Sequence, residues 1–313
     1  MGSSVTVAIV GGPGIAPELG KKGTASDVAL YNSVHDEHAA TLVEPVQFPE
    51  KLPPLLVALG MADQCLLVIP ELTRAVAETI AVVELTDLPV TVVTGPAVGD
   101  AELARALRGS RLESAPRASL DYPALRGRIE GWSAPHRDGA VAVSIDHAFP
   151  VQGVGTVALG VVRRGTLHAH DRLRLWPTPK EVDVRSIQVH DADRREATCG
   201  ERVGVALKGV DADEISRGEL LAPPGSLSEG VALSGGGWTR CRYYRGDAGP
   251  GARLNAAIGL QIVPVAVEEL SESAVRLTAD RPVAWEPGSP GYLLDLSVPA
   301  GPRIVGRWTF PTG

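Results

Sequence analysis

The sequence predicts an α/β domain followed by two all-β barrels. In the first third, the apolar runs Val5–Val10, Cys65–Ile69 and Val90–Val93 show no polar–apolar alternation and are separated by helical stretches. Such strands are typical of a parallel sheet that helices cover on both faces. After Trp132, short strands follow one another with turn residues between them. That spacing is typical of a barrel or a sandwich.

Two changes of composition divide the chain into three predicted domains. The first change comes after Trp132, and the second is the Pro/Gly-rich run Ala222-Pro223-Pro224-Gly225-Ser226. Proline and glycine clusters interrupt regular structure and mark linkers. The expected domains are therefore residues 1–133, 134–225 and 226–313.

The first domain is expected to be Rossmann-like, with helices joining its strands. Ser26 or Asp27 is suited to cap a helix that starts beside it, because its side-chain oxygen can accept from backbone N–H groups. The expected helices cover residues 27–32, 72–85, 101–107 and 124–129.

The two β domains are read from short apolar stretches bounded by turn residues. The expected strands cover residues 140–145, 155–162, 172–176 and 203–207 in the second domain, and 256–267, 274–277, 291–296 and 303–308 in the third. Gly153, Gly155 and Gly160 are expected to shape the barrel, where strands enter it or bend.

Composition limits the classes of function. The formal net charge is −7, which argues against a chain that coats nucleic acid, DNA included, by bulk charge. There is no run of about 18 apolar residues, so we expect no membrane span. The three cysteines, Cys65, Cys199 and Cys241, are widely spaced, so neither a disulfide nor a cysteine metal site is expected. With no leader-like start, the sequence predicts a cytoplasmic protein.

One ordered set of motifs lies in the second domain. From Gly153 the chain reads GVGTVALGVVRRG, later GERVGVALKG from Gly200, and then SRGELL from Ser216. This segment resembles the second domain of the elongation factor Tu superfamily, with the selenocysteine-specific factor SelB and its archaeal relatives as the nearest likeness. The segment Gly301–Arg307 resembles a closing strand of the family's third domain.

The resemblance implies a P-loop GTPase-type first domain, and its first expected motif is missing. A phosphate loop reads G-x-x-x-x-G-K-[ST], so that backbone N–H groups, a lysine and a hydroxyl surround the phosphates and Mg²⁺. Between Gly11 and Thr24 the only Gly-Lys pair is Gly20-Lys21, and Lys22 follows it where Ser or Thr is needed. Prolines and a glutamate in the same stretch remove N–H donors and add negative charge.

The other two expected motifs are also altered. The D-x-P-G-H motif falls on Gln47–Lys51, where Gln47, Glu50 and Lys51 replace its Asp, Gly and His. The N-K-x-D motif falls on Thr94–Ala97, and Ala97 cannot accept the two N–H groups of guanine. We therefore expect a pseudo-GTPase that has no catalytic residues and needs neither GTP nor Mg²⁺.

The lysine-rich stretch of the first domain has three interpretations. Gly20, Lys21, Lys22, Gly23 and Thr24 precede the expected helix, and the two ammonium groups beside its start could hold an anion such as an RNA phosphate. The alternatives are a solvated loop capped by Ser26 or Asp27 and a weak, nonstandard nucleotide site.

Two histidine pairs are candidates for metal ligands. His35 with His38, and His168 with His170, have no third ligand at a recognisable spacing. A surface helix and a hairpin turn explain them better, so no metal is expected.

RNA contact is the favoured chemistry of the β domains. Gln188, Arg202 and Lys208 fall near positions where, by the resemblance, the family holds the aminoacylated end of tRNA. In the third domain, Arg240, Arg242 and Arg245 alternate with aromatic residues, as on RNA-stacking surfaces. The alternative for that run is an ordinary arginine-covered strand.

The sequence thus predicts a translation-factor-like protein that binds tRNA or the ribosome without hydrolysing GTP. Two alternatives stay open: a working SelB-type GTPase that delivers selenocysteyl-tRNA, and a scaffold that binds protein and no RNA. The charge distribution agrees with the first interpretation. Residues 1–133 hold 10 basic and 16 acidic residues, whereas residues 134–225 hold 12 and 13 and residues 226–313 hold 8 and 8.

Overall fold

The computed structural model describes residues 3–35, 38–299 and 301–312. The chain forms two compact units. The first consists of Met1–Ala134 with the segments Arg240–Gly246 and Asp295–Val305, and the second of Pro135–Thr239, Asp247–Leu294 and Gly306–Gly313. Each unit is described by itself.

The first unit contains a seven-stranded sheet in the order β2-β3-β4-β1-β5-β6-β7. Strands β1, β4, β5, β6 and β7 run parallel, and β2 and β3 extend the sheet as an antiparallel hairpin beside β4. The strand bounds are β1 Ser3–Val10, β2 Lys21–Ala25, β3 Val28–His35, β4 His38–Pro45, β5 Gln64–Ile69, β6 Val90–Thr94 and β7 Arg117–Ser119. The predicted parallel core is confirmed, and the sheet as a whole is mixed.

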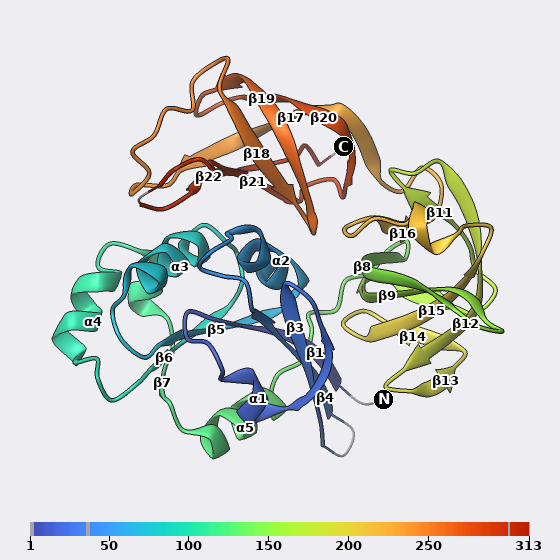
Figure 1. The fold of residues 1–313 in the computed structure, drawn as a ribbon, viewed down its shortest axis with the longest axis horizontal. Coiled ribbons are helices and arrows are strands. Elements are labelled where there is room, and N and C mark those ends of the chain that lie inside the picture. Colours follow the sequence, from blue (N-terminus) through green and yellow to red (C-terminus); the bar gives the residue numbers. More distant parts are fainter. Residues whose placement is uncertain (1–2, 36–37, 300, 313) are drawn as a thin grey trace. The chain divides into compact units, whose positions relative to one another are not determined.

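Helices cover both faces of this sheet (Figure 1), with α2 and α3 on one face and α1 and α5 on the other. The bounds are α1 Ala16–Leu19, α2 Pro53–Met61, α3 Arg74–Glu84, α4 Asp100–Leu107 and α5 Tyr122–Glu130, with a 3-10 turn, η1, over Arg111–Ser114. Thr73 caps α3 by accepting from the N–H of Val76, and Asp121 caps α5 through Ala124. The helices expected near 72–85, 101–107 and 124–129 are confirmed.

The helix expected over 27–32 is wrong, because these residues belong to strand β3. Val28 to Tyr31 are buried, and every described residue of β3 pairs with β4, from Val28 opposite Pro45 to His35 opposite His38. Asp27 does not cap a helix: its carbonyl accepts from the N–H of Val46. The cap-like Ser-Asp pair marks a turn between strands here, since these residues favour turns as well as helix starts.

The second unit holds two barrels. In the first barrel the order β11-β16-β8-β9-β15-β12 closes through pairing of β11 with β12, and β13 adds to β12. The strands are β8 Ala142–Val151, β9 Gly155–Arg164, β11 Arg172–Trp176, β12 Lys180–Val189, β13 Ala192–Arg194, β15 Arg202–Lys208 and β16 Leu220–Ala222, with a separate pair of β10 Thr166–His168 and β14 Glu196–Thr198. The four strands expected in this domain are confirmed.

The other barrel is closed in the order β17-β20-β19-β18-β21-β22. Its strands are β17 Ser228–Arg240, β18 Arg253–Ile258, β19 Gln261–Leu270, β20 Val275–Trp285, β21 Pro290–Leu294 and β22 Ile304–Thr309. The expected segment 256–267 is a hairpin of β18 and β19, and the later segments match β20 to β22. Among the described residues, no helix is both long enough and apolar enough to cross a membrane.

Gly160 lies where strands β8 and β9 of the first barrel approach each other closely. A Cβ atom at Gly160 would lie 2.4 Å from the carbonyl oxygen of Ser144, on the neighbouring strand β8. The pairing of β8 with β9 shifts register directly beside it, between Ile145 and His147. Close approach of the two backbones therefore requires glycine here.

We expect Gly160→Ala to destabilise the second unit by about 1–3 kcal/mol, because the added methyl group must push β8 away from β9. Gly204→Ala is the matched control, since the nearest atom to its Cβ would be in the Leu159 side chain, at 3.4 Å. Calorimetric unfolding compares the two variants. Equal unfolding temperatures for the two variants would contradict this account of Gly160.

Candidate functional site

A cavity of about 210 Å³ opens at the carboxyl edge of the α/β sheet, where β1 and β5 end. In open α/β sheets, ligands bind outside the carboxyl ends of the parallel strands. The cavity is lined by Ile9, Gly11, Gly12, Pro13, Glu44, Pro45, Phe48, Pro49, Pro70, Glu71, Thr73, Ala75 and Val76. The segments that follow β1 and β4, where the resemblance places the first two GTPase motifs, therefore meet at the position that a ligand takes in this class of fold.

The chemistry of this cavity is apolar and acidic. Two carboxylates, those of Glu44 and Glu71, line it, and no lysine or arginine is among its described lining residues. Four of the lining residues are prolines, which have no N–H to donate. A phosphate group needs N–H donors and a cation, so the lining disfavours an anionic ligand.

The loop after β1 donates to one of these carboxylates. The N–H of Gly14 donates to Oε1 of Glu44 at 2.5 Å, and the backbone of Ile15 also hydrogen-bonds to the same side chain. Glu44 is buried, and this burial raises the pKa of its carboxyl although both backbone hydrogen bonds act to lower it.

The stretch Gly20–Thr24 does not join this cavity. Lys21–Ala25 form strand β2, at the edge of the sheet, where Lys21 pairs with Asn32 and Lys22 with Tyr31. Both lysine residues are exposed and neither lines the cavity. The expected solvated loop before a helix is wrong, because the chain after Gly20 pairs with β3. A role for these lysine residues in anion binding stays a prediction.

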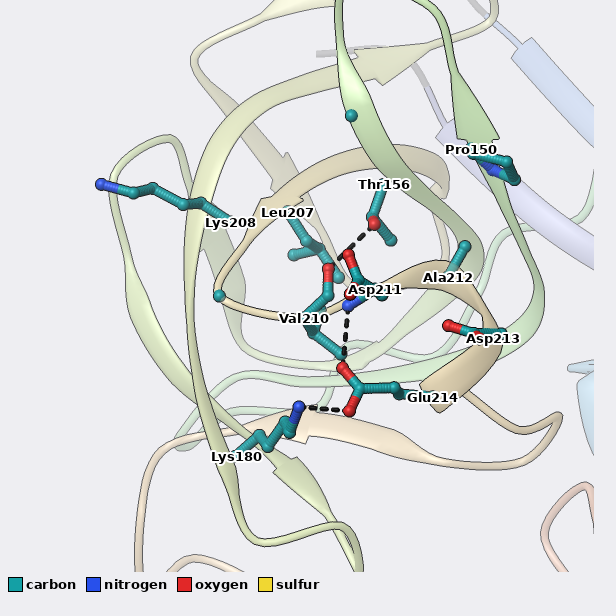
Figure 2. A pocket seen from close by; sticks show the side chains of 12 residues that line it. Pro150, Thr156, Lys180, Leu207, Lys208, Val210, Asp211, Ala212, Asp213 and Glu214 are labelled. Atoms are coloured by element: carbon teal, nitrogen blue, oxygen red, sulfur yellow. Dashed lines mark hydrogen bonds and ion pairs between the residues drawn. The ribbon is translucent and has the colours of Figure 1, made fainter.

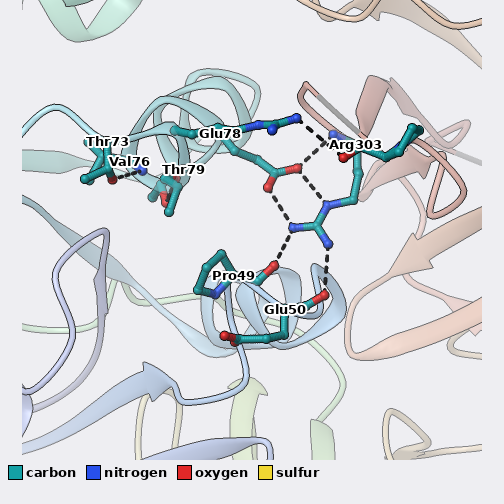
Figure 3. Close-up of polar contacts among 10 residues, drawn as sticks. Pro49, Glu50, Thr73, Val76, Glu78, Thr79 and Arg303 are labelled. Atoms are coloured by element: carbon teal, nitrogen blue, oxygen red, sulfur yellow. Dashed lines mark hydrogen bonds and ion pairs between the residues drawn. The ribbon is translucent and has the colours of Figure 1, made fainter.

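The segment Gln47–Lys51 follows β4, and Arg303 holds it (Figure 3). The Arg303 guanidinium donates to the carbonyls of Pro49 at 2.8 Å and Glu50 at 3.2 Å. It also donates to both carboxylate oxygens of Glu78 on α3, at 3.0 and 2.7 Å, and the Arg303 backbone N–H donates to Glu78 at 2.8 Å. Since the Arg303 and Glu78 side chains are 15% and 9% exposed, this ion pair is largely shielded from water. It ties the segment to α3.

The segment Thr94–Ala97, where the resemblance places the third motif, begins at the last residue of β6. The Gly95 N–H donates to the carbonyl of Ile69 at 3.1 Å, and a Cβ atom at Gly95 would lie 3.0 Å from the backbone of Pro70. This segment therefore packs against the end of β5.

In the first barrel, Arg202 belongs to a buried cluster. Its guanidinium donates to both carboxylate oxygens of Asp146 at 2.9 Å, and the His147 ring nitrogen Nδ1 lies 2.9 Å from Oδ2 of Asp146. The Asp146 side chain is 1% exposed and that of Arg202 is 12% exposed. Burial by itself raises the pKa of Asp146, but the His147 hydrogen bond and the Arg202 charge outweigh it and hold that pKa below its usual value.

Gln188 and Lys208 lie on exposed positions of the same barrel. The Gln188 amide donates to Asp193 at 2.9 Å. Lys208 lines a second cavity, of about 590 Å³, near the η2 turn Ala212–Glu214 (Figure 2). Its side chain extends away from Asp211 and Glu214, whereas Lys180 pairs with Glu214. Of the two lysine residues that line this cavity, Lys208 has no ion-pair partner in the described part of the chain.

The three arginine residues of the run 240–245 lie in a segment of the first unit and each has a partner. Arg242 pairs with Glu84 at 3.4 Å and stacks over the Tyr243 ring at 4.7 Å. Arg240 donates to the carbonyl of Gly246 and lies over the Tyr244 ring, and Arg245 donates to the carbonyl of Arg242. All three residues remain exposed.

The two histidine pairs lie in different places. The expected hairpin turn at His168 and His170 is wrong, because β10, which ends at His168, pairs with β14 and not with β11. His35 ends β3 and His38 begins β4, so the surface helix expected there is wrong; the residues between them lie outside the described part. His168 lies near Asp171 and Glu196, with ring nitrogens 3.8 and 3.6 Å from their carboxylates. Within the described residues no group of three potential metal ligands occurs.

The sequence analysis assigns no role to five residues of these clusters: Glu44, Glu78, Asp146, His147 and Arg303. The acidic residues could be found from one signal, a single carboxylate within an apolar strand or on the apolar face of a helix. Such a carboxylate is expected to be buried, and a buried charge requires a partner. The sequence alone does not show which partner that is.

Comparison with known proteins identifies the class. Residues 155–222 match the family description of elongation factor Tu domain 2. An uncharacterized protein of Methanocaldococcus jannaschii is 34% identical over 297 residues, 94% of this chain and 94% of that protein. The selenocysteine-specific elongation factor of the same organism is 34% identical over 123 residues, 39% of this chain and 26% of that protein.

Solved structures show the same fold. Translation elongation factor SelB from Methanococcus maripaludis, in complex with the GTP analogue GppNHp, has a TM-score of 0.84 at 19% identity, over 99% of this chain and 79% of that one. A bacterial selenocysteine-specific elongation factor has a TM-score of 0.81 at 16% identity, over 98% and 58%. A mixed α/β sheet domain followed by two six-stranded barrels is therefore a translation-factor architecture. The chain belongs to the elongation factor Tu/SelB family.

We expect Asp146→Asn to destabilise the protein by about 3–5 kcal/mol, because it leaves the Arg202 charge buried without a carboxylate. Asp138→Asn is the control, since Asp138 forms an exposed pair with His136 and such pairs contribute little. Calorimetric unfolding of both variants measures the difference.

The same substitution should alter how the stability of the protein changes with pH under acidic conditions. Because the pKa of Asp146 is lowered in the folded protein, its contribution is complete above its usual pKa of 3.8 and is lost as pH falls through the folded value. An asparagine side chain in its place has no such titration, so Tm of the variant should fall less steeply in that window. An unchanged pH dependence of Tm in that window would contradict the assignment.

Proposed function

We propose that this protein is an RNA-binding member of the translation factor family that acts without GTP. Its ligand is tRNA or the ribosome, and its place of action is the cytoplasm. The observation that carries the proposal is the acidic and apolar lining of the cavity at the carboxyl edge of the α/β sheet.

The first support comes from the requirements of a nucleotide triphosphate. Its phosphates need backbone N–H groups, a lysine and a hydroxyl that binds Mg²⁺. The cavity offers Glu44 and Glu71 instead, and its volume of about 210 Å³ is smaller than the roughly 300–1,000 Å³ of ordinary ligand pockets. The Gly14 N–H already has the Glu44 carboxylate as its acceptor. Nucleotide-driven switching needs contacts that this lining does not favour.

The second support comes from the barrels and the arginine segment. Family membership points to RNA, and the exposed cations Lys208, Arg240, Arg242 and Arg245 can contact phosphates. Arg202 is different, because its guanidinium is occupied by Asp146. In this proposal Arg202 orders the barrel surface and Lys208 contacts RNA directly.

We expect the protein to bind no GTP at micromolar concentration, with or without Mg²⁺, because the described lining of the cavity offers no cation and places carboxylates near the phosphates. Isothermal calorimetry with GTP measures this. Binding that depends on Mg²⁺, together with hydrolysis stimulated by ribosomes, would instead establish the SelB-type GTPase.

We expect Lys208→Ala to weaken binding of total tRNA or ribosomes and to reduce the slope of log K against log salt by about one, the loss of a single phosphate contact. Gel shift and cosedimentation over a range of salt concentrations measure this slope. Lys180→Ala is the matched control, because Lys180 lines the same cavity but its ammonium pairs with Glu214.

The protein-binding scaffold is the other outcome of that experiment. If the wild-type protein neither shifts tRNA nor sediments with ribosomes at low salt, RNA binding is wrong. A protein pull-down then addresses the scaffold.

A further inference from the structure

Glu44 joins the end of β4 to the loop that follows β1. Glu44 is the last but one residue of β4 and is 7% exposed. The N–H of Gly14 donates to its Oε1 at 2.5 Å, and the backbone of Ile15 donates to the same carboxylate. One side chain thus accepts from two consecutive N–H groups.

The loop is shaped to present these N–H groups. Gly11 and Gly14 both have positive φ, at 95° and 76°, a conformation that favours glycine. A Cβ atom at Gly11 would lie 2.4 Å from the carbonyl oxygen of Val68, so the loop presses against the end of β5. Successive backbone N–H groups that converge in a turn of this kind form a concave anion site.

The loop after β1 is the group that stabilises the Glu44 carboxylate. In the described part of the chain, neither a lysine nor an arginine pairs with Glu44. The neighbouring groups are Tyr31 and Glu71. Burial raises the pKa of Tyr31 and the Glu44 charge raises it further, and Glu71 lines the same cavity as Glu44. A buried carboxylate in such surroundings depends on hydrogen bonds from N–H donors.

We propose that Glu44 is a built-in anion that holds the Gly11–Ile15 loop in the place of a nucleotide phosphate. The loop then keeps its folded conformation without a ligand, and an external anion has to compete with a carboxylate of the chain itself. This inference rests on the proposed function, since it explains how the first domain stays ordered without GTP.

The proposal distinguishes Glu44 from Glu71, which lines the same cavity without a side-chain hydrogen bond to the loop among the described contacts. In Glu44→Ala we expect the amide protons of Gly14 and Ile15 to exchange with solvent about 10- to 100-fold faster than in the wild type, since each loses a charge-assisted hydrogen bond. Glu71→Ala should leave both rates unchanged. Hydrogen exchange followed by NMR at these two amides measures the effect.

An external anion tests whether Glu44 stands for a phosphate. Millimolar sulfate, against chloride at equal ionic strength, should slow exchange at Gly14 and Ile15 in Glu44→Ala and leave the wild type unchanged. Unchanged exchange in Glu44→Ala, or no effect of sulfate on that variant, would overturn the proposal.

A conservative variant covers the case in which Glu44→Ala does not fold. Glu44→Gln keeps one acceptor oxygen but lacks the negative charge, so exchange at Gly14 and Ile15 should quicken, by less than in Glu44→Ala. Equal, wild-type rates at both amides in this variant would also overturn the proposal. The GTP titration of the wild-type protein is independent of these rates, so failure of either claim is seen separately.

Discussion

A carboxylate that is taken out of water needs a cation or N–H donors, and this constraint organises both units of the protein. In the first unit, Glu78 meets the Arg303 guanidinium and Glu44 meets the loop after β1. In the second, Asp146 meets Arg202. Each contact joins segments far apart in the sequence, so each fixes a tertiary arrangement rather than a single element.

Most of the net negative charge of the chain lies in the first predicted domain. Residues 1–133 carry a net charge of −6, and two of their carboxylates line the cavity at the carboxyl edge of the sheet. The phosphates of a nucleotide would add negative charge to a place that already has it. Where a GTPase loop moves with its nucleotide, the segment Gln47–Lys51 here is bound through its backbone carbonyls to Arg303. The proposed function therefore requires no nucleotide-dependent movement of this edge of the sheet.

Two of the three candidate RNA contacts of the first barrel have partners within it. These two are Arg202 and Gln188, which leaves Lys208 as the exposed cation among the three. In the proposed function, each cation that contacts an RNA phosphate releases counterions, so the salt dependence of binding rises with the number of such contacts.

The amino-acid sequence is enough to predict the architecture and the family. Apolar runs, continuous or alternating and separated by turn residues, place most strands, and the glycine motif from Gly153 identifies the barrel. The strands β2 and β3 cannot be predicted in this way, because Ser26-Asp27 suits a turn and a helix cap equally and only pairing with β4 distinguishes them. The partners of Glu44, Asp146 and Glu78 likewise become visible only in the folded chain. A buried charge selects its partner by proximity in space, and that proximity exists only after the sheet and the barrels have formed.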